Sequence, residues 1–184
     1  CEEALKAGEH SCVVAEISSY QMEATTNFRP HVAVVLNVTP DHVVRHGSLE
    51  VYQQMKEKMF AQQTSEDYLV LNYDNDKTRD MAKRAKGQVF FFSRLEKLEE
   101  GAFLQDGWLT IQWQGQTCRL CRADELKIKG GHNIENALAA ASAAFLDGAR
   151  IPKIIEVLKE FAGVEHRIEP VAVIGGVAYY NDSK

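Results

Sequence analysis

The sequence lacks several features that would place a protein in a particular class. No apolar run approaches the roughly 20 residues needed to cross a bilayer, and no signal peptide is visible after the first residue, Cys1. There is no long run of lysine or arginine, and the formal net charge of the 184 residues is −5. This charge pattern argues against general binding to nucleic acid or to a membrane surface. We therefore expect no nucleic-acid partner, no membrane insertion and a cytoplasmic location.

Cysteines are few, and their spacing does not favour a metal site. The four are Cys1, Cys12, Cys118 and Cys121. The Cys118-x-x-Cys121 pair has no second ligand pair at a spacing that zinc sites use. Both residues lie in an expected strand, where an offset of three directs side chains to opposite faces. We interpret them as reduced cysteines without a metal or redox role.

A phosphate-binding loop of the form G-x-x-x-x-G-K-[ST] is also absent, and the first residue is not methionine. The last residues, NDSK, directly follow an expected strand. These features indicate a piece of a longer protein, cut at both ends. Without a phosphate loop, the piece by itself is expected to be inactive towards ATP.

Apolar runs alternate with helical patterns along the first half of the chain. The expected strands are 11–17, 32–36, 68–72 and 88–93. The expected helices are 2–7, 19–23, 48–60 and 76–86. This alternation is typical of a parallel sheet with helical crossovers.

The pattern changes after Gly101. Residues 108–113 and 116–122 alternate around Gln114-Gly115, which predicts a β-hairpin. Helices are then expected in the alanine-rich segment that ends at Gly148, and over 151–161 with Pro152 in the first turn. Strands follow at 168–174 and 177–180. The predicted fold class is α/β, a mostly parallel sheet with a small hairpin region, followed by the start of a second α/β domain; the boundary separates 1–164 from 165–184.

Polar residues at the ends of two expected strands form the first candidate site. Asn37 to His42 follow the strand at 32–36, which Pro40 cannot continue, and Glu16 stands near the end of the strand at 11–17. Parallel strands place their carboxyl ends on one side of a sheet, so Glu16 and His42 are expected to converge. A carboxylate and an imidazole suit a divalent cation that handles phosphate. Taken singly, each is more simply a hydrated carboxylate or a hydrogen-bonded structural histidine.

Lys56 is the second candidate. Tyr52, Lys56 and Phe60 are spaced at i, i+4 and i+8 and share one helical face. Taken singly, Lys56 is a solvated charge. A lysine between aromatic residues on an inward face is unusual, and this placement favours a chemical role.

The second half of the chain adds further polar candidates. Gly130-Gly131 permits close approach of the backbone to a ligand, and His132 or Asn133 could cap the following helix. Arg167 is either an ordinary exposed residue or a clamp for phosphate. The remaining candidates follow the last expected strand and are Asp182 and Lys184.

Six motifs resemble those of the Mur ligases, the ATP-dependent amide-forming enzymes of peptidoglycan synthesis. They are EISSYQ, LNVTPDH, RHGSLEVYQQMKEKMF, GGHNIENALAAASA, GVEHRIE and NDSK, in the order and spacing of that family. The resemblance spans essentially the whole chain and implies a three-domain enzyme. Residues 1–164 would form most of its central ATPase domain, and 165–184 the start of its C-terminal ligase domain. A uridine-nucleotide-binding domain and the phosphate loop would precede Cys1, and most of the D-glutamate site would follow Lys184.

The resemblance also implies residue roles. Glu16, His42 and Lys56 resemble the family's Mg²⁺ site, with Lys56 carbamylated by carbon dioxide. An ammonium would repel the cation, whereas a carbamate offers anionic oxygens. Lys56, His42 and Arg167 would serve catalysis. The residues that would bind the nucleotide-sugar and acyl-acceptor substrates are Ser18, Gln21, His42 and Lys184. The residues that would bind ATP are Asn133, Arg167 and Asp182.

Within the family, the motifs fit the member that adds D-glutamate to UDP-N-acetylmuramoyl-L-alanine with ATP, through an acyl phosphate, and a monomer is expected. One alternative is another Mur-type ligase that adds a different amino acid. A second is a non-catalytic module that keeps the fold. Its only sequence support is Val44, which stands where the family usually has an acidic residue beside the metal loop.

Overall fold

The structure is a computed structural model that describes residues 8, 11–39, 47–167 and 169–183. The expected helix at 2–7 lies outside these residues. So do Asp41, His42, Val44 and Lys184, and the predictions made for them remain predictions.

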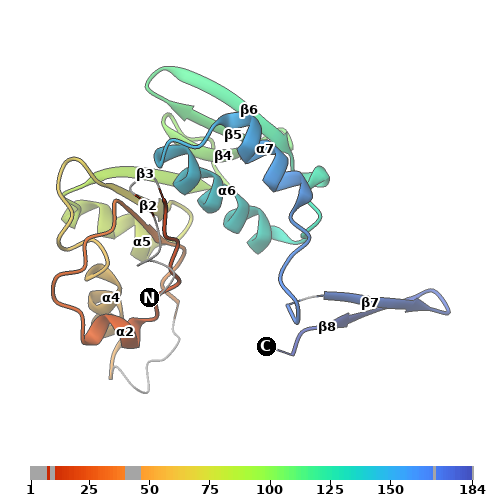
Figure 1. The fold of residues 1–184 in the computed structure, drawn as a ribbon, viewed down its shortest axis with the longest axis horizontal. Helices are drawn as coiled ribbons and strands as arrows, with labels where there is room; N and C mark the ends of the chain where they lie inside the picture. The colour runs from red at the N-terminus through yellow and green to blue at the C-terminus, as the bar shows by residue number, and fades with distance from the viewer. Residues whose placement is uncertain (1–7, 9–10, 40–46, 168, 184) are drawn as a thin grey trace.

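A six-stranded sheet organises the molecule, with the strands side by side in sequence order (Figure 1). The strands are β1 (Val32–Val35), β2 (Tyr68–Asn72), β3 (Gln88–Ser93), β4 (Gly101–Gln105), β5 (Trp108–Trp113) and β6 (Gln116–Arg122). β1 to β4 are parallel, and β5 and β6 complete the sheet as an antiparallel hairpin. The predicted α/β class, a mostly parallel sheet with a hairpin region, is confirmed.

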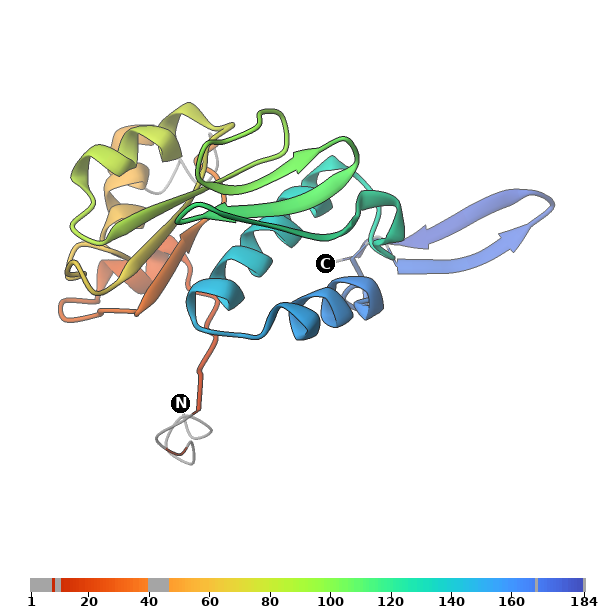
Figure 2. The same cartoon turned by 90° about the horizontal axis from the view of Figure 1, so that it is seen from above.

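Helices cover both faces of this sheet (Figure 2). The α-helices are α2 (Ser19–Glu23), α4 (Leu49–Glu57), α5 (Asp76–Met81), α6 (Gly131–Leu146) and α7 (Ile151–Glu160). The short 3-10 helices are η1 (Ala82–Arg84) and η2 (Ala123–Glu125). In the part of the chain that the structure describes, none of these helices has the length and apolar character of a membrane span.

The core follows from the alternation of side chains along β2. Val70 joins the apolar cluster that includes α6 and α7 on one face of the sheet. Leu69 and Leu71 point to the other face and join the cluster that includes Tyr52 of α4 and Met81 of α5. A strand apolar on both faces needs cover on both, so β2 lies in the interior and fixes where the two helical layers pack.

The expected buried strand at 11–17 is wrong. Those residues form no strand, and the side chains of Val13 and Val14 are 59% and 93% exposed. A buried strand needs a hydrogen-bonded neighbour and cover on both faces. Among the described residues no strand pairs with this segment, so its apolar composition does not produce a strand there.

Other differences concern boundaries and one missed strand. β4 was not predicted, because GAFLQ is short and begins with a glycine. The helix expected at 76–86 ends at Met81 and continues as η1, and the helix expected at 48–60 ends at Glu57. Cys118 and Cys121 both lie in β6 as free thiols. The expectation that they point to opposite faces is wrong, because a β-bulge between Leu109 and Thr110 shifts the register and both cysteines pack against the same apolar cluster.

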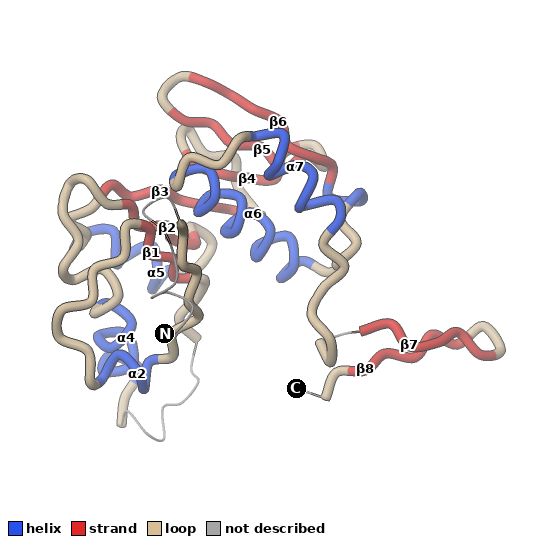
Figure 3. Tube along the Cα trace, viewed as in Figure 1, coloured by secondary structure: helices blue, strands red, loops and turns tan. Residues whose placement is uncertain are grey.

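The last strands, β7 (Glu169–Ile174) and β8 (Val177–Asn181), pair only with each other. They project from the main body as a two-stranded ribbon (Figure 3). Val171, Val173 and Ile174 are exposed there. A two-stranded ribbon is marginally stable by itself, so this part contributes little to the core.

A polar clip fastens the chain before β1 to the start of β2. Asp67, whose side chain is 5% exposed, accepts hydrogen bonds from Arg29 Nε at 2.7 Å and from the Thr64 backbone N–H at 2.8 Å. The hydrogen bond from the Arg29 guanidinium is the main reason that the pKa of Asp67 lies well below its usual range. Gln63 donates to Pro30 O and to Tyr68 O at 3.1 and 2.8 Å.

Replacing Asp67 with asparagine is expected to lower the free energy of unfolding at pH 7 by about 1–3 kcal/mol, because the acceptor for two donors is weakened. The depressed pKa means that the ionised carboxylate stabilises the fold above the unfolded-state pKa of about 3.9. That contribution is lost as the pH falls from there through the folded-state pKa. Urea titrations of wild type and Asp67→Asn should therefore converge as the pH falls below about 4.

The matched control is Asp76→Asn. The Asp76 carboxylate is 87% exposed and pairs with Arg79 on the same helix, and exposed pairs of this kind contribute little. Its unfolding midpoint should stay that of wild type. A loss in the control equal to that in Asp67→Asn, or a pH-independent gap between Asp67→Asn and wild type, would contradict the prediction.

Candidate active site

An open cavity of about 740 Å³ lies at the carboxyl end of β1. Its walls are residues 14–19, residues 34–37 at the end of β1, one side of α4, one side of α6, and Arg167. Ligands bind outside the carboxyl ends of strands in open α/β sheets, and this cavity occupies that position.

Four of the predicted site residues line this cavity. They are Glu16, Ser18, Lys56 and Arg167. The expected convergence of Glu16 with His42 is not described by the structure, since His42 lies outside the described residues. Glu16 reaches the cavity from an irregular segment, so its expected position near a strand end is wrong.

Lys56 is held at the cavity by α4. Ser48 caps this helix by accepting a hydrogen bond from the Val51 N–H, and Tyr52 is buried, as expected for the inward face. Lys56 Nζ donates to Asn37 O at 3.0 Å and lies 5.0 Å from the centroid of the Tyr52 ring. The lysine therefore stands between the end of β1 and an aromatic wall.

Among the described residues that line the cavity, cationic side chains outnumber acidic ones. Lys56 and Arg167 contribute cations, and Glu16 is the only acidic residue among the described ones that line it. Cations of this kind bind phosphate and carboxylate groups. Within the described ranges, no three acidic, histidine or cysteine side chains gather into a metal cluster.

Ser18 and Gln21 are tied to each other by the cap of α2. Gln21 N–H donates to Ser18 Oγ at 3.3 Å, and Ser18 N–H donates to Gln21 Oε1 at 2.8 Å. This reciprocal arrangement is a capping box. Ser18 lines the cavity, whereas Gln21 is exposed and outside its lining.

The start of α6 differs from the expectation that His132 or Asn133 caps it. The cap position is Gly130, with φ 102°, and no side chain caps the helix. Asn133 lies inside the first turn and its Nδ2 donates to Lys129 O at 2.8 Å, because the glycine conformation starts the helix earlier. Asn133 does not line the cavity.

Asn136, one turn further along α6, is a cavity residue that sequence reasoning missed. It lines the cavity, and its Nδ2 donates to Asn133 Oδ1 at 3.4 Å. The available signal was the i, i+3 spacing of the two asparagines on a helix, which places them on one side. Ala139, Ala140 and Ala143 continue that side of the helix along the cavity.

The turn before β7 holds Arg167. His166 adopts φ 67°, and its backbone N–H donates to Glu169 Oε2 at 2.9 Å. His166 Nδ1 and Asn181 Nδ2 are 2.8 Å apart, which ties the turn to β8. Asp182 lies just past β8, exposed and outside the cavity lining.

Replacing Gly130 with alanine is expected to destabilise the protein by about 1–3 kcal/mol, because φ 102° with ψ 153° is a region that side chains rarely adopt. A Cβ there would also stand 3.0 Å from the His132 ring. Thermal denaturation followed by circular dichroism measures the loss. Gly8→Ala is the control, since no atom of the described residues lies within 4 Å of its Cβ position; equal melting temperatures for both variants would contradict the expectation.

Comparisons with known proteins agree with this architecture. A crystal structure of MurF from Acinetobacter baumannii superposes with a TM-score of 0.69 over 89% of this chain and 35% of that chain. Its sequence identity is 20%, so the likeness concerns the fold.

Two curated relatives are the UDP-N-acetylmuramoylalanine–D-glutamate ligases of Caldanaerobacter subterraneus subsp. tengcongensis and Acidobacterium capsulatum. They are 46% identical over 181 residues and 47% identical over 173 residues. The matches cover 98% and 93% of this chain but 39% and 38% of the relatives, so the chain spans about two fifths of their length. Residues 2–144, well over half of the chain, match the family model described as the Mur ligase middle domain. On that match, and with the cavity at the end of a mostly parallel sheet, the chain belongs to the Mur ligase middle domain family.

Proposed function

We propose that the full-length protein adds D-glutamate to UDP-N-acetylmuramoyl-L-alanine with ATP, in cytoplasmic synthesis of peptidoglycan precursors. The observation that carries the proposal is the cavity that gathers Glu16, Lys56 and Arg167, in a chain 46% identical to a D-glutamate ligase. Its cations suit substrates that carry phosphates and carboxylates. The protein works as a monomer with no nucleic-acid partner.

The reaction has two steps. The γ-phosphoryl group of ATP is transferred to the carboxylate of the L-alanyl substrate, which gives an acyl phosphate and ADP. The amine of D-glutamate then attacks the acyl carbon, and the tetrahedral intermediate collapses with loss of phosphate. The contribution of the protein is positioning and charge neutralisation, and Arg167 pairs with phosphate oxygens.

Glu16, His42 and a carbamylated Lys56 would hold Mg²⁺. The Glu16 carboxylate fits this role because it lines the cavity that Lys56 also reaches. The Lys56 amine as an ammonium would repel the cation, whereas a carbamate offers anionic oxygens. Mg²⁺, when bound, neutralises charge on the phosphates of ATP.

The remaining roles follow the family motifs. ATP is contacted by Asn133, Arg167 and Asp182. The cavity residue Asn136 also contributes to this contact, because its side chain is hydrogen-bonded to that of Asn133. The residues assigned to the substrates are Ser18, Gln21, His42 and Lys184. Residues 1–164 form the central domain, and 165–184 begin the C-terminal ligase domain. The separation of the β7–β8 ribbon from the main sheet supports that boundary.

Substrate selection tests the proposed activity. The full-length protein is expected to form ADP only with UDP-N-acetylmuramoyl-L-alanine and D-glutamate together, because each phosphorylated substrate molecule needs an amine to complete turnover. A coupled assay of ADP release, run with D-glutamate, glycine, diaminopimelate or lysine, measures this. Turnover with one of the other amino acids would identify a sister ligase, and no turnover with any would favour a non-catalytic module.

Lys56→Ala in the full-length protein is expected to reduce kcat by about 10²-fold or more, since it removes the carbamate that would hold the charge-neutralising Mg²⁺. Added short carboxylic acids should restore part of the activity by supplying the missing carboxylate oxygens. Lys83→Ala is the matched control, because Lys83 pairs with Asp80 at the surface. Full activity of Lys56→Ala would refute the assigned role, and absence of rescue would refute the carbamate.

A further inference from the structure

A single side chain joins two helices that border the cavity. Lys58 is the C-cap residue of α4, and its Nζ donates to Met22 O and to Glu23 O, each at 3.0 Å. Both carbonyls belong to the last residues of α2. A lysine at this end of a helix satisfies terminal carbonyls and interacts favourably with their dipoles.

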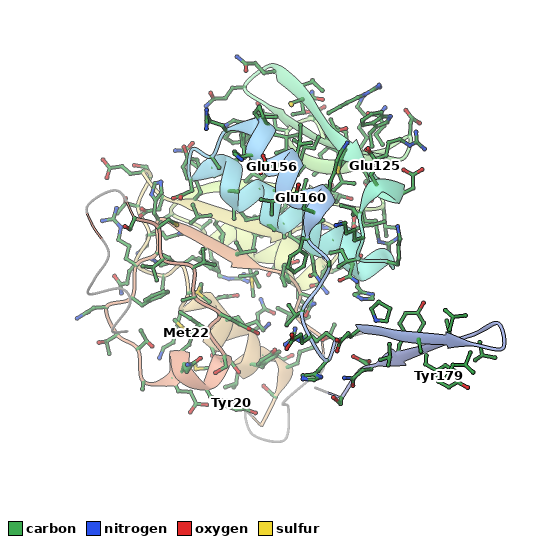
Figure 4. All side chains as sticks on the ribbon, turned by 45° about the vertical axis from the view of Figure 1, so that its right-hand side comes forward. Tyr20, Met22, Glu125, Glu156, Glu160 and Tyr179 are labelled. Atoms are coloured by element: carbon green, nitrogen blue, oxygen red, sulfur yellow. The ribbon has the colours of Figure 1, made fainter. Side chains whose placement is uncertain are left out.

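The position of α2 depends on such contacts. The helix has five residues, too few for a stable helix without tertiary packing. Its amino end is fixed by the capping box of Ser18 and Gln21. Met22 is 1% exposed and points towards the main sheet, opposite Tyr20 (Figure 4). Lys58 binds two carbonyls at the carboxyl end and so contributes to the attachment of α2.

α2 forms one wall of the cavity, through Ser18, Ser19 and Met22. Lys56 stands on another wall, two residues before Lys58 on α4. Residues two apart on a helix do not face each other, and here Lys56 reaches Asn37 O while Lys58 reaches α2. One turn of α4 therefore fixes the spacing between the α2 wall and Lys56.

We propose that Lys58 is a positioning residue that sets the α2 wall relative to Lys56 and thereby the affinity for the nucleotide-sugar substrate. The inference rests on the proposed function, in which Ser18 contacts that substrate. Lys58 is outside the lining of the main cavity and borders a separate hollow of about 240 Å³ with Thr25 and Phe28. Its loss therefore weakens binding without removing a group that acts in the reaction, which raises KM and leaves kcat unchanged.

The test compares full-length Lys58→Met with wild type. Methionine keeps much of the stem and removes the ammonium that bonds to the two carbonyls. The KM for UDP-N-acetylmuramoyl-L-alanine should rise roughly tenfold, as for loss of a charged hydrogen bond. The kcat and the KM for ATP should stay at wild-type values. Lys58→Arg keeps donors for both carbonyls and should recover most of the affinity.

Lys86→Met is the matched control. Lys86 Nζ also donates to one backbone carbonyl, Ala61 O at 3.0 Å, but it does not touch α2 or line the cavity. Its KM values should equal those of wild type. Should Lys58→Met fail to fold, Lys58→Leu, which also lacks a donor, replaces it with the same expected rise in KM.

An unchanged KM for the nucleotide sugar in Lys58→Met, or an equal rise in Lys86→Met, would overturn the inference about Lys58. A wild type that makes no ADP with D-glutamate would instead overturn the proposed function. Calorimetric titration of wild type and Lys58→Met with the nucleotide sugar then tests the role of Lys58 without turnover. The proposal requires a roughly tenfold higher Kd for Lys58→Met.

Discussion

The burial of β2 on both faces is the constraint on which the other elements depend. Leu69 and Leu71 require a helical layer on one side, and Val70 requires one on the other. Since the connections between parallel strands are crossovers, the helices pack on the faces and the loops collect at the strand ends. The cavity at the carboxyl end of β1 follows from that arrangement, with α4 on one side and α6 on the other.

α4 contributes both to the apolar core and to the candidate active site. Its buried Tyr52 packs in the apolar cluster that covers one face of β1 and β2. The same ring lies beside the Lys56 side-chain nitrogen. Two residues later Lys58 holds the end of α2. A change in the packing of α4 would therefore move both Lys56 and the α2 wall, so the position of the cavity depends on the same apolar contacts that stabilise the fold.

Strong local patterns were enough to predict most elements. β2, β3, β5 and β6 have the bounds expected from their apolar runs and from the Gln114-Gly115 turn. The strand predicted at 11–17 was wrong, because a strand needs a hydrogen-bonded partner that a local pattern does not supply. The predicted capping residue of α6 was wrong, because the φ of 102° at Gly130 starts the helix before Asn133. Asn136 was missed because its approach to the cavity depends on how α6 packs against the sheet.

Composition, periodicity and local motifs were enough to specify the class of fold, the family resemblance and the inward face that carries Lys56. Tertiary structure decided which candidates share one cavity: it brought Glu16, Ser18, Lys56 and Arg167 together and left Gln21 and Asn133 outside its lining. It also decided that Lys58 reaches α2. Contacts between residues distant along the chain depend on the packing of whole elements, which no local pattern specifies.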